Sequence, residues 1–153
     1  MILVDSNLLV YAVNRDSPHH KPARDWLEST LGSTVRVGLP WISILAFLRV
    51  TTLPAVFSSP LRPGRAIEYV ESWLAQPFVN AVAPGEHHWP ILHNLLRLTG
   101  TAGNLTSDAH IAAMAIEHGA AVYSADYDFQ RFPGVRHVNP LEPPIMRIQH
   151  GAP

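Results

Sequence analysis

The sequence contains no cysteine and only one lysine, Lys21, among its 153 residues. Disulfides and thiolate-bound metals are therefore excluded, and a reducing, cytoplasmic setting fits this composition. No apolar run approaches the length of about 18 residues that spans a bilayer, so no membrane segment is expected. The apolar start is interrupted by Asp5 and has no basic leader, and we interpret it as a buried strand rather than a signal peptide.

Charged side chains are also scarce. They make up 15% of the chain and leave a net charge of −1, which argues against a strongly electrostatic nucleic-acid binder. The basic residues are nevertheless almost all arginine, whose planar guanidinium matches phosphate better than an ammonium group does. Codon bias in a GC-rich genome explains this preference equally well. Hydrophobic residues make up 47%, which predicts one globular domain with a buried core.

Short apolar segments alternate with helical patterns along the whole chain. We predict strands at 2–4, 35–37, 78–82, 121–124 and 135–138, with helices at 8–13, 22–31, 41–52, from 63, at 86–98 and from 106. Ser6 or Asn7 is expected to cap the first helix, and Thr106 or Ser107 the last. The alternation predicts an α/β fold in which helices cover both faces of a parallel sheet. The domain is expected to span 1–141, followed by a poorly ordered tail at 142–153.

Four aspartates stand where strands end or helices begin. Asp5 and Asp126 follow predicted strands near the two ends of the chain, Asp128 comes two residues later, and Asp108 lies in the first turn of a helix. Because the carboxyl ends of parallel strands meet at one edge of a sheet, these carboxylates are expected to converge there. Carboxylate oxygens are hard ligands that suit Mg²⁺ or Mn²⁺, and such a site suits the hydrolysis of phosphodiesters.

Each aspartate taken singly also has an ordinary explanation as a helix cap, a dipole partner or a turn residue. Clustering changes that assessment. Two carboxylates about 6 Å apart repel each other by roughly 3 kcal/mol at an effective dielectric constant near 20. Four of them would cost on the order of 10 kcal/mol before screening, while a domain has only about 5–15 kcal/mol of net stability. Either cations occupy the cluster or the four acids are not clustered.

The chain resembles the PIN-domain ribonucleases of the VapC toxin type from about Met1 to Leu141. The resemblance rests on four segments in matching order and spacing, namely 4–7, 106–113, 124–129 and 133–135. It implies a three-layer α/β sandwich with a central parallel sheet and an Mg²⁺- or Mn²⁺-dependent endonuclease that cuts RNA. It further implies tRNA or ribosomal RNA as the substrate, inhibition of translation, a VapB-type antitoxin as the partner, and a homodimer.

One position departs from the family pattern. Most PIN domains carry a glutamate in the third helix, where this sequence has Ala46, and no Asp or Glu occurs between Glu28 and Glu68. The gap puts a second metal ion, or its usual geometry, in question. Asp128 is the candidate to compensate in part.

The expected metal ligands are Asp5 and Asp126 directly, Asp108 directly or through water, and Asp128 at a second ion or at a water. Phosphodiester attack by a metal-activated water then needs no histidine base.

Four further side chains are candidates to bind phosphate or to support the ligands. Ser6, Asn7 and Ser124 can hold phosphate or ordered water. Arg49 lies one helical turn from Ala46, where it can bind phosphate or reduce the repulsion between the acids; a plain surface role is equally consistent.

Other signals are weaker. The nine histidines form no zinc pattern and are expected at the surface or in caps. The four tryptophans are expected to pack in the core, or in a partner groove, rather than to stack on bases. An antitoxin groove between the third and fourth helices would involve Phe47, Leu48 and Trp73, which fit core positions equally well. The alternatives are a nuclease for DNA or structured nucleic acid, a catalytically weak RNA-binding module and, remotely, an aspartyl phosphatase.

Overall fold

Five short parallel strands form the central sheet of the computed structural model, which describes residues 1–100 and 102–142. The strand order is β3-β2-β1-β4-β5, and every neighbouring pair runs parallel. The strands are β1 (Ile2–Val4), β2 (Val37–Pro40), β3 (Val79–Val82), β4 (Ala121–Tyr123) and β5 (Arg136–Val138). The predicted parallel α/β class is confirmed.

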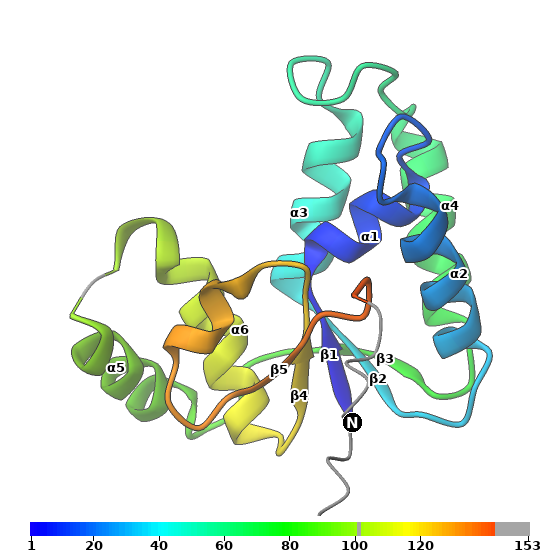
Figure 1. The fold of residues 1–153 in the computed structure, drawn as a ribbon. Helices are drawn as coiled ribbons and strands as arrows, with labels where there is room; N and C mark the ends of the chain where they lie inside the picture. Colours follow the sequence, from blue (N-terminus) through cyan, green and yellow to red (C-terminus); the bar gives the residue numbers. More distant parts are fainter. Residues whose placement is uncertain (101, 143–153) are drawn as a thin grey trace, which may run out of the picture.

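Helices cover both faces of this sheet. They are α1 (Ser6–Val13), α2 (His20–Leu31), α3 (Trp41–Thr52), α4 (Pro63–Leu74), α5 (His88–Thr99) and α6 (Thr106–Glu117), with short 3₁₀ helices η1 (Gly103–Leu105) and η2 (Tyr127–Arg131). Figure 1 shows α1 to α4 gathered on one side of the sheet and α5 and α6 on the other. Among the described residues, no helix is long and apolar enough to cross a membrane.

The central strand contributes to two separate hydrophobic cores. Ile2 and Val4 pack in the core formed with α1 to α4, whereas Leu3 packs in the core formed with α5 and α6. This is the two-residue period of a strand that is buried on both faces. The uninterrupted apolar run at the start of the chain follows from this position in the middle of the sheet.

Three details of the predicted elements are wrong. Val35 and Arg36 are exposed, and the second strand starts only at Val37, where the chain enters the sheet. Neither Ser6 nor Asn7 caps α1, because Asp5 occupies the cap and accepts from the Ser6 amide.

No side chain caps α6, since the chain enters it directly from η1 and Thr106 is already its first residue. Of the predicted tail, residues 143–153 lie outside the described residues.

The strand order creates a switch point beside β1. The chain leaves β1 for β2 and β3 on one side and later adds β4 and β5 on the other. Val4 is in register with Tyr123, and the Asp5 amide donates a hydrogen bond to the Tyr123 carbonyl at 3.0 Å. The carboxyl ends of β1 and β4 therefore lie side by side, which is where open α/β sheets bind their ligands.

Candidate metal centre

Asp5 is the buried member of the acidic group. Its Oδ1 accepts hydrogen bonds from the Ser6 amide at 2.6 Å and the Ser6 hydroxyl at 3.3 Å, and its Oδ2 accepts from the Ser124 hydroxyl at 2.7 Å. Burial raises the pKa of Asp5 above its usual value in spite of these hydrogen bonds, and the nearby charge of Asp126 acts in the same direction. Asp5 is therefore both the cap of α1 and part of the acidic site.

Ser124 links the two adjacent strand ends. Its buried hydroxyl donates to Asp5 and accepts from the Asn7 side-chain amide at 2.9 Å and from the Asp126 backbone amide at 2.9 Å. A serine hydroxyl has one donor and two acceptor positions, so all three are used. This favours positioning over phosphate binding for Ser124. Asn7 completes the link by accepting from the Ala125 amide at 3.3 Å.

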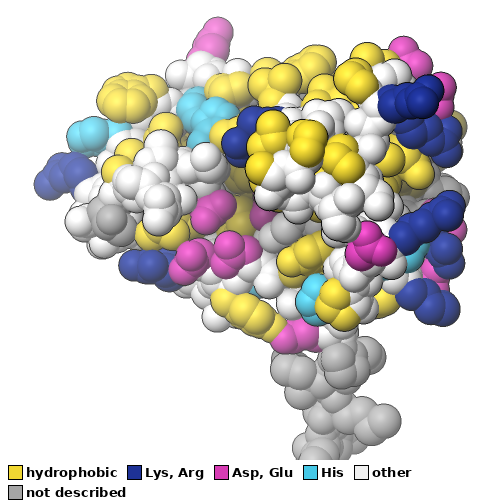
Figure 2. Space-filling model, turned by 90° about the horizontal axis from the view of Figure 1, so that it is seen from above, with side chains coloured by type: hydrophobic (Ala, Val, Ile, Leu, Met, Phe, Trp, Pro, Cys, Tyr) yellow, Lys and Arg dark blue, Asp and Glu magenta, His cyan; other side chains and the backbone are white. Residues whose placement is uncertain are grey.

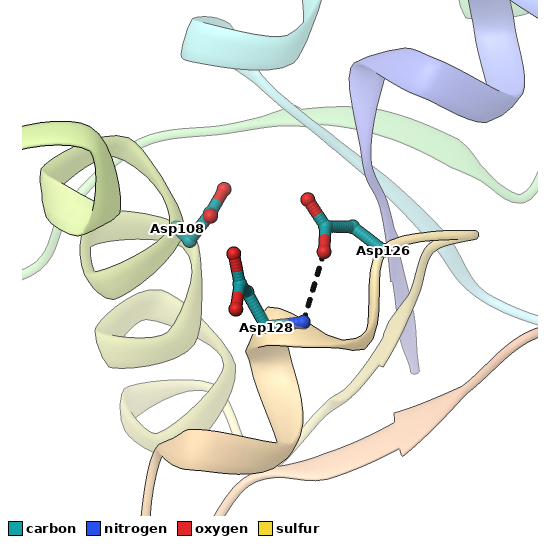
Figure 3. Close-up of side chains that lie close together, drawn as sticks. All are labelled: Asp108, Asp126 and Asp128. Carbon is teal, nitrogen blue, oxygen red and sulfur yellow. Dashed lines mark hydrogen bonds between the residues drawn. The ribbon is translucent and has the colours of Figure 1, made fainter.

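Three carboxylates converge just beyond this link. Asp108, Asp126 and Asp128 each offer an oxygen, and these oxygens all lie within 4.8 Å of one another. Figure 3 shows Asp108 reaching from α6 towards the two aspartates of the segment that follows β4. The Asp128 amide donates to Asp126 Oδ1 at 2.9 Å, which fixes the turn between the two. Arg131 contacts Asp128 at 3.5 Å on the exposed side.

The electrostatics of this trio are unfavourable without a counter-charge. Partial burial, together with the charges of Asp5, Asp126 and Asp128, raises the pKa of Asp108 to about 6. Of the four predicted ligands, Asp108, Asp126 and Asp128 form the compact set, while Asp5 lies outside it but close enough to affect Asp108. Such a set of hard oxygen donors fits a small divalent cation, which would neutralise the repulsion.

A cavity of about 290 Å³ opens beside the carboxylates, between α3 and α6. It is lined by Asp5, Ser6, Ile42, Ser43, Leu45, Ala46, Arg49, Ser107, Asp108 and Ile111. Its size is near the lower end for ligand pockets in proteins. Ala46 does face this cavity, so the third helix contributes no carboxylate to it. Figure 2 shows the acidic side chains gathered around a hollow on this face of the molecule.

Asp126 and Asp128 line a second hollow, and Asn7, Tyr11, Ala125 and Tyr127 complete its lining. Asp5 and Asp108 thus line one hollow, and Asp126 and Asp128 line another. The sequence patterns indicated neither tyrosine as part of the site, although Tyr127 lies between two candidate ligands.

Ser43 is another residue that the sequence analysis missed. It lines the cavity, is 1% exposed, and its hydroxyl has no hydrogen-bond partner within the described part of the chain. Its spacing of three residues from Ala46 places both on one face of α3, and this spacing was the available signal.

Two predictions for other side chains are wrong. His88 is buried rather than at the surface, and its Nε2 lies 2.8 Å from Nδ1 of His110, which joins α5 to α6. Burial lowers the pKa of both histidines. Trp41 and Trp89 are 50% and 66% exposed, so the core placement is wrong for both, whereas a place in a partner groove stays a prediction.

Phe47 and Trp73 are core residues, in agreement with one of the two interpretations of the predicted antitoxin groove. A hollow on that side of the molecule lies between α2 and α4, and of the three residues predicted for the groove only Trp73 is among its lining residues.

Comparison with known families places this site in context. A model of the PIN domain matches residues 2–135, which is most of the chain. The chain belongs to the PIN-domain family. Within it, the chain is similar to Ribonuclease VapC37 of Mycobacterium tuberculosis, with 46% identity over 140 residues that cover 92% of this chain and 97% of that protein. Ribonuclease VapC33 of the same organism is 40% identical over 141 residues, with 92% and 99% covered. The predicted membership in the VapC group is confirmed.

Solved structures share the VapC fold. VapBC2 from Rickettsia felis, bound to a DNA fragment from its promoter, matches with a TM-score of 0.67 at 19% identity, over 91% of this chain and 98% of that one. VapBC-1 from nontypeable Haemophilus influenzae matches with a TM-score of 0.64 at 20% identity, over 93% and 100%. The predicted three-layer PIN-like sandwich is thereby confirmed.

Proposed function

We propose that this VapC-type PIN domain is a divalent-metal-dependent endoribonuclease whose centre is formed by Asp5, Asp108, Asp126 and Asp128. The observation that carries the proposal is the convergence of three carboxylate oxygens within 4.8 Å at the switch point of the sheet. A cluster with this repulsion is costly unless a cation occupies it. The names of the relatives, which are ribonucleases, support RNA as the substrate class.

In this proposal the chain holds the ion with the compact trio. Asp108, Asp126 and Asp128 supply direct oxygens or hold its waters, and Asp5 keeps one lone pair free on Oδ2 for the same purpose. A bound Mg²⁺ or Mn²⁺ would supply an acidified attacking water and stabilise charge on the leaving oxygen. Ser124, Asn7 and Ser6 position these carboxylates through hydrogen bonds.

Cleavage of a labelled RNA tests the proposal. Asp108→Asn and Asp126→Asn are each expected to reduce the single-turnover rate at saturating Mg²⁺ or Mn²⁺ by at least about a hundredfold, the usual scale for a lost electrostatic contribution to catalysis. Asp25→Asn on the exposed face of α2 is the matched control and should cleave at the wild-type rate. Wild-type rates in all these variants, or undiminished cleavage in excess chelator, would refute the metal-nuclease proposal.

The structure gives one reason to test a second candidate. Ala46 leaves α3 without a carboxylate, which suits a module that binds RNA but cleaves it weakly. Turnover measured during titration with metal separates the two, because a binding module would saturate with RNA and show no cleavage. Competition between RNA and DNA substrates separates a ribonuclease from a nuclease for DNA or other structured nucleic acid.

We further propose that the protein acts in the cytoplasm on tRNA or ribosomal RNA, stops translation, and is neutralised by a VapB-type antitoxin. The solved VapBC complexes support the antitoxin. Exposed Trp41 and Leu45, one turn apart on α3, support a homodimer, because they offer apolar surface to a second copy. Mapping of RNA ends after a pulse of expression tests the RNA target. Co-purification with the native operon product tests the antitoxin, and light scattering tests the homodimer.

A further inference from the structure

One face of α3 forms a wall of the cavity beside Asp108. Ile42, Leu45, Ala46 and Arg49 line the cavity, at the spacing that places residues on one side of a helix. Asp5 and Asp108 lie on the opposite wall. The cavity therefore has an acidic wall and a second wall whose only formal charge is the positive charge of Arg49.

Arg49 has no ion pair with any residue among 1–100 and 102–142. Two carboxylates share the cavity lining with Arg49. Asp5 already accepts hydrogen bonds on both oxygens, and Asp108 forms no ion pair with Arg49. The Arg49 guanidinium thus keeps its five donors available, in a geometry that matches the oxygens of a phosphate.

Ser43 provides an independent indication of a ligand. Its hydroxyl is buried and unpaired, and leaving such a group without a partner costs about 1–3 kcal/mol. It lies in the first turn of α3, which carries no acidic residue and no side-chain cap, so the positive end of the helix dipole is not compensated. An acceptor group that enters the cavity would satisfy the hydroxyl and face this positive end.

We propose that the α3 wall of the cavity is a subsite for a second backbone phosphate of the RNA, bound by Arg49 and Ser43. This inference rests on the proposed nuclease function. The subsite occupies the wall on which Ala46 offers no ligand to a second cation. The Arg49 guanidinium there attracts the phosphate next to the one being cleaved, and it repels a metal ion from the same wall.

Binding of a short labelled single-stranded RNA in EDTA tests the subsite without cleavage. Removal of one phosphate contact reduces the slope of log K against log salt by about 0.7 for a single strand. Arg49→Gln should therefore lower this slope by about 0.7 and weaken binding at low salt about three- to tenfold. Arg49→Lys should keep most of the slope, because the charge remains. Ser43→Ala should weaken binding severalfold and leave the slope unchanged, since a neutral hydroxyl releases no counterion.

Arg36→Gln is the matched control. Arg36 is exposed and lies just before β2, at the amino ends of the strands and so away from the carboxylates at their carboxyl ends. The RNA affinity and the salt slope of Arg36→Gln should therefore equal those of the wild type. Thermal unfolding checks that every variant is folded. If Ser43→Ala is unfolded, the comparison of Arg49→Gln with Arg49→Lys still decides the question.

An unchanged slope in Arg49→Gln would overturn the subsite. If the slope were unchanged and the same variant bound Mn²⁺ more tightly, Arg49 would serve only to reduce the carboxylate repulsion. Either result would leave metal-dependent cleavage by the wild type intact. Failure of the proposed function would appear separately, as a wild-type protein that binds RNA and does not cleave it.

Discussion

Replacement of Asp108 by asparagine is expected to stabilise the metal-free protein. Partial burial and three neighbouring aspartates raise the pKa of this carboxyl to about 6, from an ordinary value of 3.8. A shift of this size would correspond to about 3 kcal/mol for a fully buried group. Asp108 is only half-buried, so solvent screening reduces the expected effect to about 1–2 kcal/mol. For a domain of this length, that raises the melting temperature by about 2–8 °C.

The sign of the pH dependence follows from the same shift. The folded state binds the proton of Asp108 more tightly than the unfolded state, so the stability of the wild type falls as the pH rises from about 4 through 6. The stabilisation by Asp108→Asn should therefore be complete above about pH 7 and disappear below about pH 4. Chemical denaturation in EDTA at several pH values measures this difference directly.

Divalent metal should reverse the order of stabilities. A cation that binds the folded wild type at a hundredfold excess over its Kd adds about 2.7 kcal/mol, whereas the asparagine variant has lost one ligand and gains less. Asp25→Asn on α2 is the control for the loss of a carboxylate outside the cluster. Lys21 and Arg24 stabilise the Asp25 carboxylate and lower its pKa, whereas the pKa of Asp108 is raised. If Asp108→Asn destabilised the metal-free protein at pH 8, the electrostatic account of the cluster would be refuted.

Two further predictions concern the packing that positions the site. Ser124→Ala removes three hydrogen bonds, from the Asp126 amide, the Asn7 side-chain amide and Asp5 Oδ2. Urea denaturation should therefore show a loss of about 2–4 kcal/mol, against about 1 kcal/mol or less for Ser72→Ala on α4. Gly38→Ala places a Cβ 2.5 Å from Leu3 and 2.7 Å from Val82, which should lower the free energy of unfolding by about 1–3 kcal/mol. The control Gly64→Ala in α4 meets no atom within 4 Å and should raise the free energy of unfolding by about 0.5–1 kcal/mol.

Much of the fold could be predicted from the sequence, because burial repeats within each element. The buried run before Asp5 has a single physical explanation, and the helix predicted at 41–52 coincides with α3. Periodicity shows that one face of a helix is apolar, but it does not show whether a large residue at the margin of that face is covered. For this reason the core placement expected of Trp41 and Trp89 is wrong.

The acidic site was predictable only in outline. Strand-end aspartates can be recognised because parallel strands share an edge, and the structure brings them to it. Hydrogen bonding across long sequence separations cannot be read in the same way. Ser124 and Asn7 are both candidates in the sequence, but nothing local shows that they contact each other across 117 residues. The His88–His110 contact between α5 and α6 was missed for the same reason.

Four aspartates that look equivalent in the sequence are physically different in the structure. Asp5 is buried, caps α1 and is held by Ser124, so its position is fixed by the central sheet. Asp126 and Asp128 lie on the turn after β4, which is held by the hydrogen bond between them and by the bond from the Asp126 amide to Ser124. Ser124 thus holds both the buried carboxylate at the end of β1 and the start of the turn that carries the other two. Burial is the main cause of the raised pKa of both Asp5 and Asp108, but only Asp126 adds to it at Asp5, whereas all three other aspartates add to it at Asp108.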